Sequence, residues 1–316
     1  MRKRPLGLAF NSLRLLVIAF ILFIAIMGFV IMVVPSGKPE HKGPPFPPGY
    51  FNSQLAQVSF ATMSSTANDV YIVHGATGNF QKFNLATHRV YNFGVPVVSG
   101  KFVISPDGSL ICSFENGRIM FYTFSAAQIG NSDGSVELTN PGANSNPLMQ
   151  FSNDGSTLYV LVNKTIYVVS INKRMILKTI LLKKAAVSFA VSADNSKLYF
   201  IGGSGASGYF FIMSLLNNEV ILESETNEYS EISIAGTAGT VALLSSDRRT
   251  ITIMNGTSIM REINVQSGLT PSKIVYNSNS NNLIVVSESS NGTIFVTSIS
   301  LASYASTLLS SFPGYN

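Results

Sequence analysis

The charged residues that could form a catalytic or ligand site are few and lie far apart in the sequence. Lys101, Glu231 and Lys273 each fall in a short apolar segment that we expect to line the centre of the fold. One carboxylate and two amines can bind a small anion. They lack the pair of proton-transferring groups that general acid–base catalysis uses, so no catalytic residue is predicted.

Two other patterns are associated with cofactors or metals but have simpler explanations. Gly203, Gly205 and Gly208 have the spacing of a dinucleotide-binding loop, but the segment that follows, 209–213, favours a strand where that loop needs a helix. A glycine-rich hairpin is the preferred interpretation. The 3 histidines, His41, His74 and His88, are expected outside any site, and no acidic segment has the spacing of a calcium loop. We therefore predict no metal and no cofactor.

Three sequons have the pattern Asn-x-Thr, at Asn163, Asn255 and Asn291. Each is a candidate for N-glycosylation if the domain is exported. Asn-Gly, present at two of them, is also a preferred two-residue hairpin turn. Both interpretations agree in placing these residues at exposed hairpin tips.

Two charge clusters flank predicted outer strands. A basic cluster contains Lys173, Arg174, Lys178, Lys183 and Lys184, and an acidic cluster contains Glu219, Glu223, Glu225, Glu228 and Glu231. Charged edge strands prevent edge-to-edge aggregation, which is the preferred interpretation. The alternative is electrostatic complementarity between copies of the chain or with a partner.

The elements that position these residues belong to an internal repeat. Segments 102–124, 149–171 and 189–215 each contain an apolar strand, a turn of the form Ser-x-Asp-Gly/Asn, a second strand, a loop and a third strand. A fourth strand follows, and the repeat of roughly 40 residues is the length of one β-propeller blade. We predict an all-β propeller of about six four-stranded blades, with seven as the alternative.

The innermost strand of each blade should lie beside the axial channel. The predicted inner strands are Gln57–Thr62, Lys101–Ser105, Leu148–Ser152, Val187–Val191, Ser230–Ala235 and Ser272–Tyr276. Lys101, Glu231 and Lys273 are the ionisable residues of this set, so they are the candidates for the channel.

The segment 151–160, Phe-Ser-Asn-Asp-Gly-Ser-Thr-Leu-Tyr-Val, and its continuation 166–171 resemble the repeats of WD40-like propellers, and more closely the YVTN-type repeats. The resemblance covers roughly residues 57–312. It implies the propeller fold but no single function, because such families include lactonases, binding scaffolds and surface proteins. The sequence has no Trp, and blades five and six lack the Asp-Gly turn.

The N-terminal region predicts a membrane anchor. Leu15–Val34 has no charged side chain, and about 20 residues at 1.5 Å each span a bilayer core of about 30 Å. We assign residues 13–34 to a transmembrane signal anchor in contact with the lipid bilayer. A cleaved signal peptide and a pilin-like leader cut after Gly7 are the alternatives.

Charge sets the expected orientation of the anchor. Arg2, Lys3, Arg4 and Arg14 precede the apolar segment and account for most of the net charge of +5. Residues 1–12 are therefore expected in the cytoplasm, and residues 51–316 outside it. The folded part is nearly neutral, so we predict no nucleic-acid partner.

Residues 35–50 are rich in proline and are predicted to form an extended stalk. Cys112 is the only cysteine, so no intramolecular disulfide can form, and its apolar neighbours favour a buried position.

Three functional hypotheses follow. The leading one is a single-pass membrane protein that presents a propeller on a cell, envelope or virion surface, where a protein or glycan partner binds one face. The second is a membrane-tethered hydrolase of the lactonase type that acts on a small ligand in the axial channel. The third is a filament or virion subunit that self-associates through its apolar helix.

Overall fold

The computed structural model describes residues 58–64, 68–74, 80–93, 102–125, 128–139, 147–204, 207–236 and 239–313. All of these belong to the second of two compact units, Gly49–Asn316; the first is Met1–Pro48. The predicted tail (1–12), anchor (13–34) and stalk (35–50) lie outside the described residues. Among the residues described, no helix is long and apolar enough to cross a bilayer.

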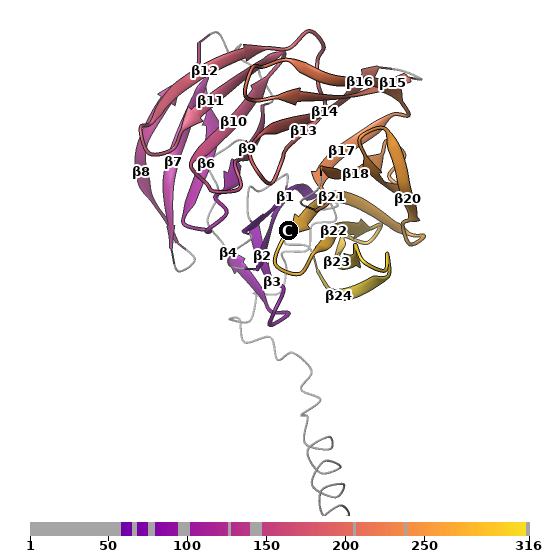
Figure 1. The fold of residues 1–316 in the computed structure, drawn as a ribbon. Helices are drawn as coiled ribbons and strands as arrows, with labels where there is room; N and C mark the ends of the chain where they lie inside the picture. The colour runs from indigo at the N-terminus through magenta and orange to yellow at the C-terminus, as the bar shows by residue number, and fades with distance from the viewer. Residues whose placement is uncertain are drawn as a thin grey trace, which may run out of the picture. The chain divides into compact units, whose positions relative to one another are not determined.

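The described strands form six antiparallel sheets of four, and each sheet uses four strands that are consecutive in the chain (Figure 1). Blade 1 contains β1 (Val58–Ser64), β2 (Asp69–His74), β3 (Phe80–Asn84) and β4 (Val90–Phe93). Blade 2 contains β5 (Phe102–Ile104), β6 (Leu110–Glu115), β7 (Arg118–Ser125) and β8 (Gln128–Glu137). Blade 3 contains β9 (Leu148–Phe151), β10 (Thr157–Val162), β11 (Thr165–Ser170) and β12 (Met175–Leu181).

Blade 4 contains β13 (Ser188–Val191), β14 (Lys197–Ser204), β15 (Ser207–Ser214) and β16 (Val220–Thr226). Blade 5 contains β17 (Tyr229–Ile234), β18 (Thr240–Ser245), β19 (Thr250–Asn255) and β20 (Ser258–Asn264). Blade 6 contains β21 (Leu269–Asn277), β22 (Asn282–Ser289), β23 (Thr293–Ser300) and β24 (Ser306–Pro313). The prediction of six four-stranded blades is confirmed, and all six predicted inner strands overlap observed first strands.

The core is distributed between the blades. Six buried clusters each join two neighbouring blades, and one of them joins blade 6 to blade 1. The middle strands alternate between these clusters, because successive side chains of a strand point to opposite faces. In β10, for example, Leu158 and Val160 pack toward blade 2, whereas Tyr159 and Leu161 pack toward blade 4. A blade buries both faces only when it has two neighbours, so the ring has to close.

The ring closes between blades 6 and 1 by packing. Figure 1 shows β1 and β2 beside β21 and β22, in agreement with the contacts between β1 and β21. The Phe83 and Phe312 rings stack with their centroids 5.9 Å apart. Gln81 Nε2 donates a hydrogen bond to the carbonyl oxygen of Pro313 at 3.3 Å. Each described sheet uses only its own consecutive strands; Phe51–Ala56, a candidate for pairing with the last blade, lies outside the described residues.

The antiparallel topology gives the ring two different ends. The turns between the first and second strands and between the third and fourth strands lie at one end, which we call the Asp-turn end. The turns between the second and third strands lie at the other end, together with the connections between blades. We call this the crossover end. The inner strand of every blade therefore begins at the crossover end.

The Ser-x-Asp turns are held by their own side chains. In blade 4, Ser192 Oγ donates to Asp194 at 2.6 Å, and the Ser196 hydroxyl donates to the same carboxylate at 2.8 Å. The amide of Lys197 donates to Ser192 Oγ at 2.9 Å. Hydrogen bonds from Ser192 and Ser196 lower the pKa of Asp194 to about 2. Blades 2 and 3 repeat this arrangement at Asp107 and Asp154.

The same turn occurs in blades 5 and 6, but on the second hairpin. In blade 5 Ser245 Oγ donates to Asp247 at 2.6 Å, and in blade 6 Ser289 donates to Asn291. The first hairpins of these blades lack the Asp-Gly turn, as the sequence indicated. In these two blades the motif therefore lies at the crossover end. The same turn can connect two antiparallel strands at either end of a blade.

Candidate functional site

Two of the three predicted channel residues come together in the structure. Glu231 lies on β17 and Lys273 on β21, the inner strands of neighbouring blades. Lys273 Nζ lies 2.6 Å from Glu231 Oε1, and the side chains are 19% and 16% exposed. Lys101 lies outside the described residues. The pair is an ion pair between blades, so these two charges neutralise each other.

A β-bulge precedes each member of this pair. Ser230 is the extra residue between Tyr229 and Glu231, and Ser272 is the extra residue between Pro271 and Lys273. A bulge changes the direction of the side chain that follows it. The two strands thus use the same local irregularity, near the crossover end, to direct Glu231 and Lys273 toward each other.

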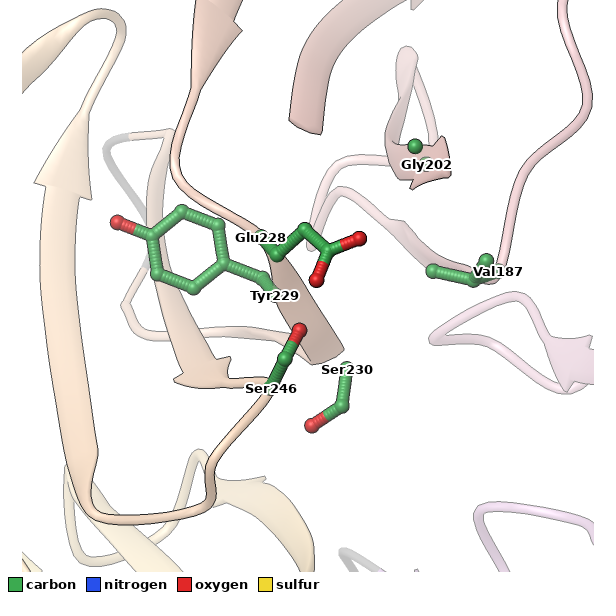
Figure 2. Close-up of a pocket in the computed structure, with 7 residues that line it drawn as sticks. Val187, Gly202, Glu228, Tyr229, Ser230 and Ser246 are labelled. Carbon is green, nitrogen blue, oxygen red and sulfur yellow. The ribbon is translucent and has the colours of Figure 1, made fainter. Parts of the chain in front are cut away.

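A recess of about 260 Å³ opens beside β17 at the crossover end, between blades 4 and 5. Its lining combines one carboxylate, two serine hydroxyl groups, one tyrosine, two glycines and one valine: Val187, Gly202, Gly203, Glu228, Tyr229, Ser230 and Ser246. Figure 2 shows the Glu228 carboxylate extended toward the open space flanked by Val187 and Gly202, and the hydroxyl groups of Ser230 and Ser246 lie below it.

Glycine positions the walls of the recess. A Cβ at Gly202 would lie 2.5 Å from the carbonyl oxygen of Ala185, so only glycine lets the connection from blade 3 lie against this hairpin. A Cβ at Gly208 would collide with the carbonyl oxygen of Asn227 and lie 3.2 Å from the Glu228 Cα. Both connections that form the recess are therefore in direct backbone contact with the β14–β15 hairpin.

Backbone hydrogen bonds complete the same walls. The Val187 amide donates to the Ile201 carbonyl at 2.9 Å, and the Ser246 amide donates to the Glu228 carbonyl at 3.1 Å. Ser230 Oγ donates to the Ser245 carbonyl at 3.2 Å. The recess is thus formed by fixed backbone segments of two blades.

The hairpin explains the dinucleotide-like glycine spacing. Gly203 pairs with Gly208 across β14 and β15, and β15 continues as a strand. The predicted hairpin is confirmed. Gly208 of this spacing and the adjacent Gly202 allow close packing of the two connections, and sequence reasoning found the hairpin without finding the recess beside it.

The two charge clusters meet each other across blades 3 and 4. Lys184 pairs with Glu223, and Lys178 Nζ donates to Asn218 Oδ1 at 2.9 Å. A further basic residue, Arg174, pairs with Asp133 of blade 2 at 3.0 Å. Neither interpretation from the sequence included this pairing. It arises because the connection between blades 3 and 4, which carries Lys184, lies beside the outer strand β16, which carries Glu223, so opposite charges interact within one molecule.

The sequon residues lie at exposed hairpin tips, as predicted. Asn163 is exposed at the turn between β10 and β11, with φ of 56°. Asn255 is exposed at the turn between β19 and β20, which belongs to the Asp-turn end. Asn291 is also exposed, and its Oδ1 accepts a hydrogen bond from the Thr293 amide at 3.1 Å. Glycosylation of these residues stays a prediction.

Among the described side chains, the remaining candidate reactive groups are a histidine and a cysteine, and neither lies in the recess. His88 is exposed in the turn between β3 and β4, and its ring stacks on Phe83 at 6.1 Å. Cys112 is 0% exposed, and burial raises the pKa of its thiol. Within the described ranges, no group of three or more His, Cys, Asp or Glu side chains could hold a metal ion. His41 lies outside these ranges.

Comparisons with known proteins give the fold and no closer relationship. No protein-family model matches the sequence, and no curated protein matches it. A solved structure of Kuenenia stuttgartiensis hydrazine synthase is similar at 11% identity, with a TM-score of 0.57; the match covers 86% of this chain and 90% of that one.

The β-propeller domain of Cps50 (Swd1) from Myceliophteria thermophila is also similar at 11% identity, with a TM-score of 0.54; the match covers 76% of this chain and 96% of that one. At this identity the similarity shows the fold alone. The chain is thus a six-bladed β-propeller, the fold that its resemblance to WD40-like repeats implied.

Proposed function

We propose that this protein is a membrane-anchored β-propeller that acts as a binding or structural module on the extracytoplasmic side, on a cell, envelope or virion surface. The observation that carries the binding role is the recess at the crossover end. Its walls are backbone segments of two blades, and glycines and interstrand hydrogen bonds hold them in place. A site whose walls are already fixed loses little conformational entropy when a ligand binds.

The membrane part of the proposal is supported by the sequence. The apolar segment within residues 13–34 matches the thickness of a bilayer core, and the basic residues before it favour a cytoplasmic N-terminus. The proline-rich residues 35–50 would then separate the propeller from the lipid surface. A protein or glycan partner at one face of the ring is the expected ligand, and the apolar helix offers a second contact for self-association.

Alkaline extraction of membranes tests the anchor. The full chain should remain in the membrane pellet after carbonate treatment at high pH, because a spanning helix is not released by loss of surface charge. A chain without residues 13–34 should be released in soluble, folded form. Release of the full chain by carbonate would contradict the proposal, and so would retention of the shortened chain.

The oligomeric state of the full chain in detergent tests self-association. A stable monomer would limit the helix to an anchoring role. An oligomer that becomes monomeric when residues 13–34 are removed would show that the helix also joins copies of the chain.

A further inference from the structure

We propose that the recess between blades 4 and 5 binds a primary alkylammonium group, from either a free small amine or a lysine side chain of a partner. This inference deepens the proposed binding function and rests on it. It assigns Glu228 as the residue that recognises the ligand, with Ser246 as a hydrogen-bond acceptor beside it and Val187 as the apolar wall.

The charge of the recess selects a cation. The Glu228 side chain is half-buried, and among the described residues its carboxylate has no hydrogen-bond or ion-pair partner. A carboxylate withdrawn from water is stabilised by a hydrogen-bonded cation. An ammonium group supplies three donors and a full positive charge, and these match the carboxylate and the adjacent hydroxyl oxygen.

Two lysines near the recess are already paired with other carboxylates. Lys184 belongs to the connection that carries Val187, and it pairs with Glu223. Lys273 lies on the next inner strand and pairs with Glu231. Neither lysine therefore neutralises Glu228, which is the one carboxylate among the described residues that line the recess, and an anionic ligand would meet repulsion from it.

The size of the recess limits what enters it. A volume of about 260 Å³ is below the roughly 300–1,000 Å³ of pockets that enclose drug-sized ligands. It admits one unbranched side chain or a small amine, whose methylene groups would contact Val187, 47% exposed at the rim. A nucleotide or an oligosaccharide exceeds this volume and would extend beyond the rim.

The rigidity of the walls favours binding by a small group. Gly202 and Gly208 hold both connections against the hairpin, and Ser246 is tied to Glu228 through the backbone. The carboxylate is thus attached to a fixed segment at the start of β17, so binding does not require the recess to form first.

Titration calorimetry of the full chain in detergent with n-butylammonium chloride tests the proposal. The expected result is saturable binding at one site. In Glu228→Gln the affinity should fall by at least about tenfold, because the amide oxygen still accepts a hydrogen bond from the ammonium group but the negative charge that strengthens it is lost. Glu225→Gln removes the same charge from the exposed outer strand nearby and should leave the affinity unchanged. Butanol, which has the same chain without the charge, should not bind.

A second variant separates loss of binding from loss of folding. Val187→Phe keeps the carboxylate but fills the rim of the recess, and it should also weaken butylammonium binding while thermal unfolding stays cooperative. Lack of saturable butylammonium binding by the unmodified protein would overturn the proposal. Equal affinity in Glu228→Gln and the unmodified protein, or equal binding of butanol, would overturn it too.

Peptides distinguish the two sources of the ammonium group. Tighter binding of a lysine-containing peptide than of butylammonium, abolished by acetylation of the lysine amine, would identify a protein partner. Equal or weaker binding of the peptide would identify a free amine. If amine binding fails while carbonate extraction still retains the full chain, the ligand assignment is wrong and the membrane-anchored module stands.

Discussion

The ion pair between Glu231 and Lys273 gives the sharpest quantitative test of how blades 5 and 6 are joined. The two charged atoms are 2.6 Å apart, and the side chains are 16% and 19% exposed. Exposed pairs contribute about 0.2–1 kcal/mol, whereas removing one partner of a fully buried pair costs about 3–5 kcal/mol. For a pair that is mostly but not fully buried, we expect each single substitution to lower the free energy of unfolding by about 1–3 kcal/mol.

The assay is a double-mutant cycle measured by urea unfolding. Glu231→Gln and Lys273→Met should each destabilise the propeller, and the double variant should lose less than the two single losses combined. The coupling energy should be about 1 kcal/mol or more, and should decrease at high salt because the pair is partly exposed. The matched control is the pair of Arg118 and Glu137, whose atoms are 3.4 Å apart and whose side chains are 53% and 74% exposed.

The control cycle should give a coupling energy below about 0.5 kcal/mol. If the Glu231–Lys273 cycle is additive within about 0.5 kcal/mol, the ion pair does not join the blades energetically, and our interpretation of the paired bulges is refuted.

Three further perturbations test other parts of the ring. Asp194→Ala should lower the free energy of unfolding by about 1 kcal/mol, because the hydrogen bonds of the turn are lost. In the unmodified protein, the low pKa of Asp194 stabilises the fold above pH 3.8, and this contribution should disappear as the pH falls toward about 2. Thermal unfolding measured against pH should therefore show a smaller loss of stability over this range in the variant than in the unmodified protein. Gly202→Ala should cost about 1–3 kcal/mol, because its Cβ would lie 2.5 Å from the Ala185 carbonyl oxygen; an unchanged melting temperature would contradict the close packing. Phe83→Ala should cost about 3–5 kcal/mol in urea unfolding, because Phe83 is 0% exposed where blade 1 packs on blade 6; a loss below about 1 kcal/mol would mean that this contact does not close the ring.

The blade architecture could be predicted from the sequence because each local signal agrees with the fold. Apolar alternation marks strands, and the turns at Asp107, Asp154 and Asp194 mark the ends of three inner strands. Their spacing of roughly 40 residues leaves little choice except a propeller. The inner-strand positions of Glu231 and Lys273 also followed from this spacing.

The detailed contacts could not be predicted, because they depend on which residues face each other between blades. The pairing of Lys184 with Glu223 depends on where the connection between blades 3 and 4 lies relative to β16, and the pairing of Glu231 with Lys273 requires two bulges. A bulge shifts the register by one residue without a distinctive sequence.

The recess was missed for a similar reason. The sequence shows Glu228 only as a member of an acidic cluster, although its position immediately before an inner strand could have marked it as a residue of the crossover end. The role of Gly202 and Gly208 depends on contacts with two connections, one before and one after the blade that contains them. Glycine spacing within a hairpin does not reveal such contacts.

Labelling of introduced cysteines on intact cells tests the central claim most directly. Cys112 is 0% exposed and its raised pKa makes it unreactive, so the unmodified propeller should give no background. We predict that a membrane-impermeant maleimide labels Ala302→Cys, in the exposed last turn of blade 6, on intact cells, and labels Ser12→Cys only after permeabilisation. Labelling of Ser12→Cys but not Ala302→Cys on intact cells would place the propeller in the cytoplasm and contradict the account.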